Sequence, residues 1–255
     1  MVTVRDIDAF MTKIAPKELS EEWDNDGVML CGNFDGKVSK VLCALEVSEK
    51  LVSYAVENGF DLVVTHHPFI FRKLPRIDGK SYEKIAPLIK NGISVLSYHT
   101  RLDSADGGVN DTLANVLGLC DVAGFGGESG KLGRIGNVKE TTFEEFGKHL
   151  LTDLGCKNIR ACDGGKPIKR VALVGGSGKD FLFDAAFSGA DAFVTSEIPH
   201  HLYEEAKNLG LSVYDCGHYY TENCISGKIS QMIKNEFPKV HTEVFDVGSP
   251  YICLQ

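Results

Sequence analysis

The sequence predicts an α/β protein of two similar domains, each built from a mostly parallel sheet flanked by helices. Strand-like and helix-like segments alternate along the whole chain, which is the pattern of parallel sheets with covering helices. A length of 255 residues with 43% hydrophobic residues is enough for one large or two ordinary α/β domains. The segment "VENGFDLVVTHHP" also parallels "AFSGADAFVTSEIPHH", which indicates a weak internal repeat.

The first domain is expected over residues 1–125. Its first helix has apolar residues at helical spacing from Val4 to Ile14 and ends before Pro16. Ser48 is a suitable N-cap for a later helix, which closes at Gly59. The order expected is a helix over 4–14, a short strand within 23–32, a strand over 38–47, a helix over 49–59, a strand over 61–68, a helix over 81–92 and a strand over 93–100.

The second domain is expected over residues 126–255, at a glycine-rich join that covers 124–136. Its first helix has a threonine cap and glutamates in the first turn. The order expected is a helix over 141–155, a strand over 170–176, a helix over 179–189, a strand over 191–197, a helix over 202–210, a strand over 211–218 and one or two strands within 242–254. These C-terminal strands could pack back on the first domain.

Charge and cysteine usage exclude several classes of protein. The net charge of −8, from 27 Lys and Arg against 35 Asp and Glu, disfavours nucleic acid as a partner. The N-terminus has no apolar signal core, and no run approaches the roughly 18 apolar residues of a membrane span, so a cytoplasmic protein without a membrane partner is expected. The eight cysteines never form C-x-x-C, which disfavours a disulfide framework and an all-cysteine zinc site.

Polar side chains follow three of the predicted strands. His66 and His67 leave one strand together. Asp103 lies four positions after His99, and Glu222 lies four positions after His218, so one helical turn brings each pair onto one face. Because ligands of open α/β sheets gather at the carboxyl ends of strands, these groups occur where a site is expected.

Each of these clusters alone also fits a polar strand end or a capped helix. Together they offer five or six nitrogen and oxygen ligands, which exceeds what one tetrahedral ion needs. The number suits two ions that share a carboxylate. The combination therefore favours a metal site.

Weaker features leave alternatives open. "VALVGGSGKD" fits either a structural turn or an anion site at a helix N-terminus, but it is not a Walker A loop. Glu197, His200 and His201 follow another strand, where a helix cap or a role in orienting a ligand is expected, and His201 could contact the site. Trp23, with Asp24 and Asn25, is either an anchored turn or a polar contribution to the cleft. No nucleophile elbow is present, which disfavours covalent acyl transfer.

The chain resembles the Nif-three-like dinuclear-metal proteins, often labelled GTP cyclohydrolase 1 type 2 homologues, over essentially its whole length. The resemblance rests on "EEWDNDGVMLCG", "DLVVTHHPFIF", "SYHTRLDSADGGVNDTLANVLGL", "KRVALVGGSGKDF" and "CGHYYTEN", in that order. It implies that the paired histidines, the aspartate of H-T-x-x-D and the histidine and glutamate of G-H-x-x-x-E bind two metal ions. In this chain the implied ligands are His66, His67, Asp103, His218 and Glu222.

The resemblance also implies two domains that face each other across a metal-containing cleft, assembled into a toroidal homohexamer. The join at 124–136 leaves no room for the inserted domain of some relatives, so the chain has the short form. Relatives often have aspartate where this chain has Glu46, and Glu46 is therefore not counted as a ligand.

The function expected is that of a metal-dependent hydrolase acting on a small molecule. Two divalent ions of Zn, Fe, Mn or Ni would hold a bridging hydroxide that attacks a nucleotide ring carbon or a phosphate ester. His99 or His201 would act as general acid or base, or would orient a ligand. The alternative is a non-catalytic hexameric assembly or regulatory protein that binds metal.

Overall fold

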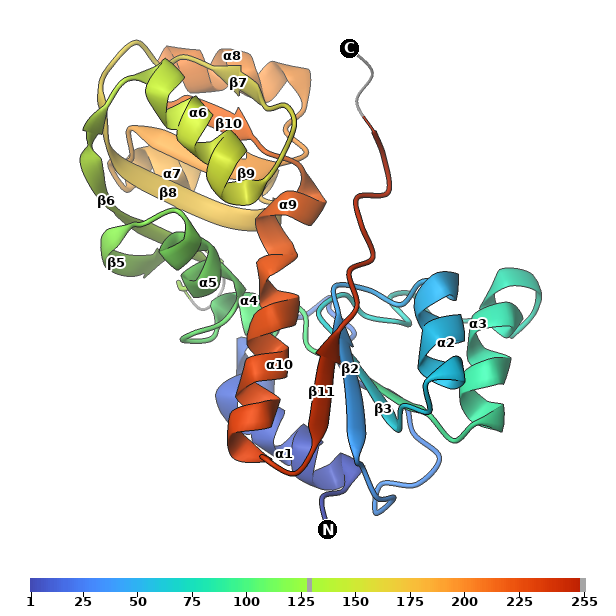
Figure 1. Ribbon diagram of the computed structural model, residues 1–255. Helices are drawn as coiled ribbons and strands as arrows, with labels where there is room; N and C mark the ends of the chain where they lie inside the picture. The colour runs from blue at the N-terminus through green and yellow to red at the C-terminus, as the bar shows by residue number, and fades with distance from the viewer. Residues whose placement is uncertain (128–129, 253–255) are drawn as a thin grey trace. The chain divides into compact units, whose positions relative to one another are not determined.

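The computed structural model describes residues 1–127 and 130–252 (Figure 1). The chain divides into two compact units, one of residues 1–102 with 225–248 and the other of residues 103–224 with 249–255. The domain division predicted at residue 125 has other bounds and stays a prediction. Residues 128–129 of the glycine-rich join and residues 253–254 of the last predicted segment lie outside the described residues. Within the described ranges, no helix is long and apolar enough to cross a membrane.

The first unit contains a five-stranded sheet in the order β1-β4-β3-β2-β11. β11, β2, β3 and β4 are parallel, whereas β1 is antiparallel to β4. All residues of β3 are buried, as expected of a parallel strand that is covered on both faces. The strands are β1 (Gly27–Leu30), β2 (Lys40–Ala44), β3 (Leu62–Thr65), β4 (Ser94–Ser97) and β11 (His241–Val244).

Helices cover both faces of this sheet, with α2 and α3 on one side and α1 and α10 on the other (Figure 1). Local sequence sets where these helices begin. Thr3 and Asp6 form a capping box at α1, and the hydroxyl of Ser48 caps α2. The helices are α1 (Val4–Ile14), the 3-10 helix η1 (Lys17–Leu19), α2 (Glu49–Glu57), α3 (Gly79–Lys90) and α10 (Cys224–Glu236).

The second unit contains a six-stranded sheet in the order β5-β6-β8-β9-β10-β7. Its centre, β8-β9-β10, is parallel. Antiparallel strands extend the sheet at both edges, with β5 and β6 beyond β8 and with β7 beyond β10. The strands are β5 (Cys120–Phe125), β6 (Gly133–Thr141), β7 (Arg160–Cys162), β8 (Ile168–Ser177), β9 (Ala192–Ser196) and β10 (Ser212–Asp215).

Alternate residues of β9 enter two hydrophobic clusters on the two faces of the second sheet. Phe193 packs with residues of α7 and α8, whereas Ala192 and Val194 pack with residues of α5 and α6. The remaining helices are α4 (Thr100–Ser104), α5 (Val109–Val116), α6 (Phe143–Leu154), the 3-10 helix η2 (Lys179–Phe181), α7 (Leu182–Phe187), α8 (His200–Leu209) and α9 (His218–Glu222). The limit between the units falls inside α4.

The predicted α/β class, with sheets flanked by helices, is confirmed, and the predicted elements differ from the observed ones mainly in their ends. The helix expected over 179–189 is η2 followed by α7, and the segment within 242–254 contributes only β11 among its described residues. The antiparallel pair β5 and β6 was not predicted because its glycines suggest turns. Strand β7 and helices α5 and α10 were not predicted either. At Gly133 a Cβ would lie 2.5 Å from the ring of Phe125, so glycine there allows close packing inside the sheet.

A buried arginine ties α4 to the second sheet. The Arg134 guanidinium donates to the side chain of Asp111 and to the backbone carbonyls of Ser104 and Ala105 at the end of α4. Burial raises the pKa of Asp111, but hydrogen bonds from Arg134 and from the Gly107 backbone outweigh burial and lower this pKa below its usual value. Asp111 therefore stabilises the fold as a carboxylate.

We expect Asp111→Asn to lower the free energy of unfolding by about 1–3 kcal/mol at pH 7, because a charged hydrogen bond to Arg134 is lost. Since the folded state lowers the pKa, this contribution is complete above the unfolded pKa near 4 and disappears as the pH falls through the folded pKa. Urea unfolding of chelator-treated protein between pH 7 and pH 2.5 measures the difference from wild type. A difference that stays constant over this range would contradict the role of the Asp111 charge.

Candidate metal centre

His66 and His67 follow β3 directly, so the end of this buried strand fixes the position of their backbone. His66 is fully buried, and its Nδ1 lies 2.9 Å from the backbone carbonyl of Tyr98. A carbonyl can only accept a hydrogen bond, so Nδ1 is the protonated nitrogen and Nε2 carries the lone pair of the neutral ring. His66 is thus held in the tautomer that ligates through Nε2.

The backbone of His67 is hydrogen-bonded, and its ring lies beside that of His66. Its N–H donates to the Leu45 carbonyl at 2.8 Å, and its Nδ1 lies 3.5 Å from Oε2 of Glu46. The ring centroids of His66 and His67 are 5.2 Å apart. Glu46 is not among the predicted ligands. Its carboxylate faces Nδ1 of His67, where it can orient the ring of His67.

His99 joins this pair from the end of β4. One atom each of His66, His67 and His99 lies within 4.8 Å of the other two, so these residues form a group that could hold a metal ion. The Nδ1 of His99 lies 2.9 Å from Oδ1 of Asp24, while Oδ2 of Asp24 accepts from the backbone and hydroxyl of Thr100. His66, His67 and His99 thus form a histidine cluster in the first unit. The carboxylate of Asp24 fixes the ring of His99.

The environment of Asp24 keeps it ionised. Burial raises its pKa, but the hydrogen bond and charge of His99, together with hydrogen bonds from Thr100, outweigh burial and lower the pKa to about 2. An ionised carboxylate can only accept, so Nδ1 of His99 is the donor. The sequence predicts Asp24 either in an anchored turn or as a polar contribution to the cleft. It does not predict the contact with His99, because that histidine is 75 positions away.

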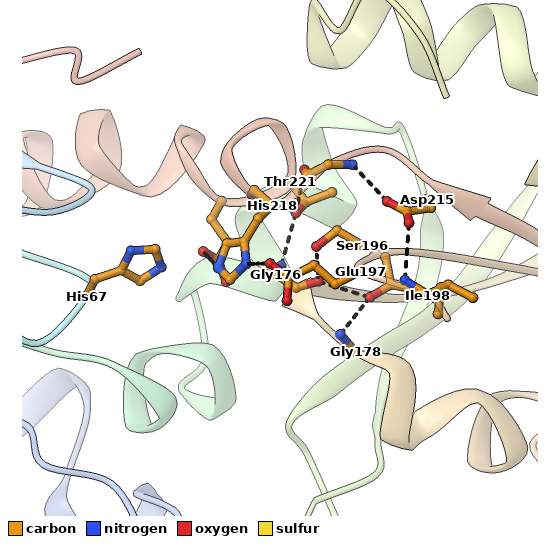
Figure 2. Close-up of polar contacts among 12 residues, drawn as sticks. His67, Gly176, Gly178, Ser196, Glu197, Ile198, Asp215, His218 and Thr221 are labelled. Atoms are coloured by element: carbon orange, nitrogen blue, oxygen red, sulfur yellow. Dashed lines mark hydrogen bonds and ion pairs between the residues drawn. The ribbon is translucent and has the colours of Figure 1, made fainter. Parts of the chain in front are cut away.

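In the second unit, His218 and Glu222 lie one turn apart on α9, as their spacing predicts. The Nε2 of His218 is 2.9 Å from Oε2 of Glu222. On the other side of the ring, Nδ1 lies 2.8 Å from Oε1 of Glu197 (Figure 2). Glu197 therefore has the ligand-orienting position that was one of its two expected roles, and Nε2 of His218 faces the carboxylate of Glu222.

Glu197 adopts an unusual backbone conformation, with φ at +59°. Non-glycine residues seldom occupy this region, and such strain concentrates at functional sites. Asp215 helps to hold the turn, because its Oδ2 accepts from the backbone N–H of Ile198 at 3.1 Å (Figure 2). In this conformation the Glu197 carboxylate lies against Nδ1 of His218.

Asp103 belongs to the same unit and approaches Glu222. Both side chains are buried, and one carboxylate oxygen of each lies within 4.8 Å of the other. The fully buried Asn110 supports this region, since its side chain donates to the Asp103 and Leu132 carbonyls and accepts from Gly175 N–H at 2.8 Å. Two buried carboxylates beside an imidazole are a donor set suited to a divalent cation.

The glycine-rich end of β8, with Gly175 and Gly176 in the strand and Gly178 just after it, lies against these ligands. Its glycine N–H groups do not form an anion site. The N–H of Gly176 donates instead to the side chain of Thr221 (Figure 2). The N–H groups of Gly175 and Gly178 donate to the side chains of Asn110 and Thr195. The sequence left two interpretations of this segment open, a structural role and an anion site. These hydrogen bonds fit the structural role.

Gly176 lets the backbone approach the ligand atoms closely. A Cβ at Gly176 would lie 2.1 Å from Oε1 of Glu222 and 2.9 Å from Nε2 of His218. The space between these atoms and the backbone of Gly176 is therefore kept free of side chains. A divalent cation fits the residues present, because they offer imidazole and carboxylate donors around a cradle that a single methyl group would fill.

His201, the other residue predicted to act in acid–base chemistry, lies elsewhere on the second unit. It is exposed in the first turn of α8. No metal-ligand group found among residues 1–127 and 130–252 includes it. Its catalytic role stays a prediction, whereas His99 lies within the histidine cluster.

We expect Glu197→Ala to weaken metal binding about 10- to 100-fold, because the ring of His218 loses the acceptor that orients it. Calorimetric titration with zinc measures this change. Glu204→Ala, at an exposed position of α8 in the same unit, is the matched control. Equal affinities of the two variants would contradict the orienting role of Glu197.

Comparison with known proteins adds an independent finding. The family model Duf34/NIF3 (NGG1p interacting factor 3) matches residues 2–249. The chain is 38% identical over 240 residues to a GTP cyclohydrolase 1 type 2 homolog of Clostridium perfringens, covering 91% of each. The hypothetical protein SA1388 of Staphylococcus aureus has a TM-score of 0.88 at 26% identity, covering 99% of each chain. Reduced HcgD from Methanocaldococcus jannaschii has a TM-score of 0.83 at 28% identity, covering 95% of this chain and 97% of that one.

Proposed function

The chain belongs to the Duf34/NIF3 family, and we propose that it is a metal-dependent hydrolase that binds two divalent ions. The metal ligands in this proposal are His66, His67, Asp103, His218 and Glu222. The names of the curated relatives support a nucleotide as substrate, since they are called GTP cyclohydrolase 1 type 2 homologs. A phosphate ester is the other substrate class in the proposal.

The observation that carries this proposal is the orientation of two histidines. His66 directs Nδ1 to a backbone carbonyl, and His218 directs Nδ1 to the carboxylate of Glu197. A histidine that binds a metal through one nitrogen nearly always donates the other N–H to a carbonyl or a carboxylate. Both imidazoles are therefore prepared to ligate through Nε2.

Divalent ions supply Lewis acidity, which favours attack by water on phosphorus or on a ring carbon at neutral pH. The protein supplies the geometry of this step. Asp24 fixes the ring of His99 through Nδ1, so Nε2 of His99 is the atom at which a proton can be held or transferred. Glu197 and the Tyr98 carbonyl keep His218 and His66 from rotating.

The mixed imidazole and carboxylate donors suit Zn, Fe, Mn or Ni. The experiment reconstitutes metal-free protein with each ion in turn and assays nucleotides, phosphate esters and cyclic amides. Turnover in proportion to metal occupancy is the expected result. Tight metal binding without turnover on any of these substrates would contradict the hydrolase and support the non-catalytic metal-binding assembly instead. The proposed homohexamer is tested on the same samples by light scattering.

A further inference from the structure

Two aromatic side chains of the first unit are exposed beside the histidine cluster. Trp23 is 61% exposed and Phe71 is 47% exposed, although rings of this size usually bury most of their surface. The centroids of Trp23 and Phe71 lie 6.0 Å apart, and each ring also lies 6.0 Å from that of His99. The three rings thus form one aromatic surface that reaches from solvent to the cluster.

The segments that carry these rings are fixed to each other and to the core. The side-chain amide of Asn25 donates to the backbone carbonyl of Ile70, which joins the turn of Trp23 to the segment of Phe71. Next to Trp23, Asp24 is hydrogen-bonded to His99 and Thr100. The exposed rings are therefore held at a defined place, which lowers the entropy lost when a ligand binds.

Positive charge follows Phe71 along the chain. Arg72, Lys73 and Arg76 are exposed, and Asp78, which pairs with Arg76 at 3.3 Å, is the single acidic residue of the segment 69–78. The segment carries a net charge of +2, from three cations and one carboxylate, in a chain with a net charge of −8. A phosphate is therefore attracted to this segment, although the chain as a whole carries net negative charge.

We propose that Trp23 and Phe71 bind the planar ring of a ligand and that Arg72 and Lys73 bind its phosphate, so that the ligand is a nucleotide. Aromatic side chains stack on the flat face of any base, and guanidinium groups pair with phosphate oxygens. The inference rests on the proposed function, since it places the nucleotide beside the histidine cluster, and it assigns recognition to residues outside the ligand set.

Trp23 is the only tryptophan of the chain, so its fluorescence reports on this surface directly. We expect GMP and GTP to quench this fluorescence saturably in both metal-free and metal-loaded protein. Ribose 5-phosphate and pyrophosphate, which lack the ring, leave the fluorescence unchanged. Equal responses to GTP and to pyrophosphate would contradict ring recognition.

Variants separate ring from phosphate recognition. Phe71→Leu is expected to weaken GMP binding about 5- to 100-fold, the range of base stacking on aromatic side chains. Phe187→Leu is the matched control, because Phe187 is exposed on α7 of the second unit. Arg72→Gln is expected to weaken GMP but not guanosine, with Lys239→Gln as the control cation.

Binding and turnover distinguish the two proposals. Unchanged GMP affinity in Phe71→Leu and in Trp23→Leu, measured by calorimetry, would overturn this inference even where the metal-loaded enzyme hydrolyses a substrate. Nucleotide binding that depends on Phe71, without turnover, would support this inference and contradict the hydrolase.

Discussion

Replacing Gly176 with alanine is expected to lower metal affinity by more than about 100-fold while the protein stays folded. The new Cβ would lie 2.1 Å from Oε1 of Glu222, which is far inside van der Waals contact. The backbone cannot easily move away, because the N–H of Gly176 donates to Thr221 and its carbonyl accepts from Thr195 and Ser196. Glu222 must therefore leave its position, and loss of a ligand costs more than loss of a ligand-orienting partner.

A second glycine separates this effect from backbone strain. Gly176 has φ at +62°, where alanine costs about 1–2 kcal/mol whatever surrounds it. Gly155 has φ at +65°, and a Cβ there would meet nothing within 4 Å. Gly155→Ala is therefore expected to lose similar stability and to keep its metal affinity. Zinc titration calorimetry measures metal affinity, and circular dichroism measures stability. Equal metal affinities in the two variants would contradict the claim that Gly176 keeps the space beside Glu222 and His218 open.

Glu222→Gln is expected to remove metal-dependent turnover and to abolish the gain in stability that metal gives. Buried Asp103 and Glu222 place two carboxylates within 4.8 Å, which is unfavourable without a cation. The neutral amide relieves this repulsion but also weakens the pair that Glu222 forms with Nε2 of His218 at 2.9 Å. These effects oppose each other, so the metal-free variant should melt within about 4 °C of metal-free wild type. Adding zinc should then raise the Tm of the wild type and leave that of the variant unchanged.

This pair of results separates a ligand from a residue that merely supports the fold. A structural Glu222 would give a variant whose Tm is lower by more than about 4 °C in both conditions and still rises with zinc. Glu236→Gln, at an exposed position of α10, controls for the change in net charge. A variant that still gains stability with zinc as the wild type does would show that Glu222 is not a ligand.

The parts of the site that could be predicted are those encoded by local order. His66 and His67 were placed by the strand that precedes them, and the pair of His218 and Glu222 by helical spacing. These rules hold because a strand end and a helical turn fix side chains relative to nearby residues only.

The parts that could not be predicted depend on distant residues. Asp24 contacts a histidine 75 positions away, and Asn110 bridges to Gly175 across 65 positions. Glu197 was predicted to be a helix cap or a ligand-orienting residue. Its positive φ is set by the surrounding turn and is not predicted by any pattern of residue types. Strands β5 and β6 were missed because their glycines serve close packing within the sheet.

The central claim is that five side chains of this chain bind two divalent ions. Elemental analysis combined with anomalous scattering from crystals of the metal-loaded protein tests it most directly. We predict two ions per chain about 3.5–4 Å apart, ligated by His66, His67, Asp103, His218 and Glu222. A single ion per chain, or ions bound by other residues, would contradict the claim.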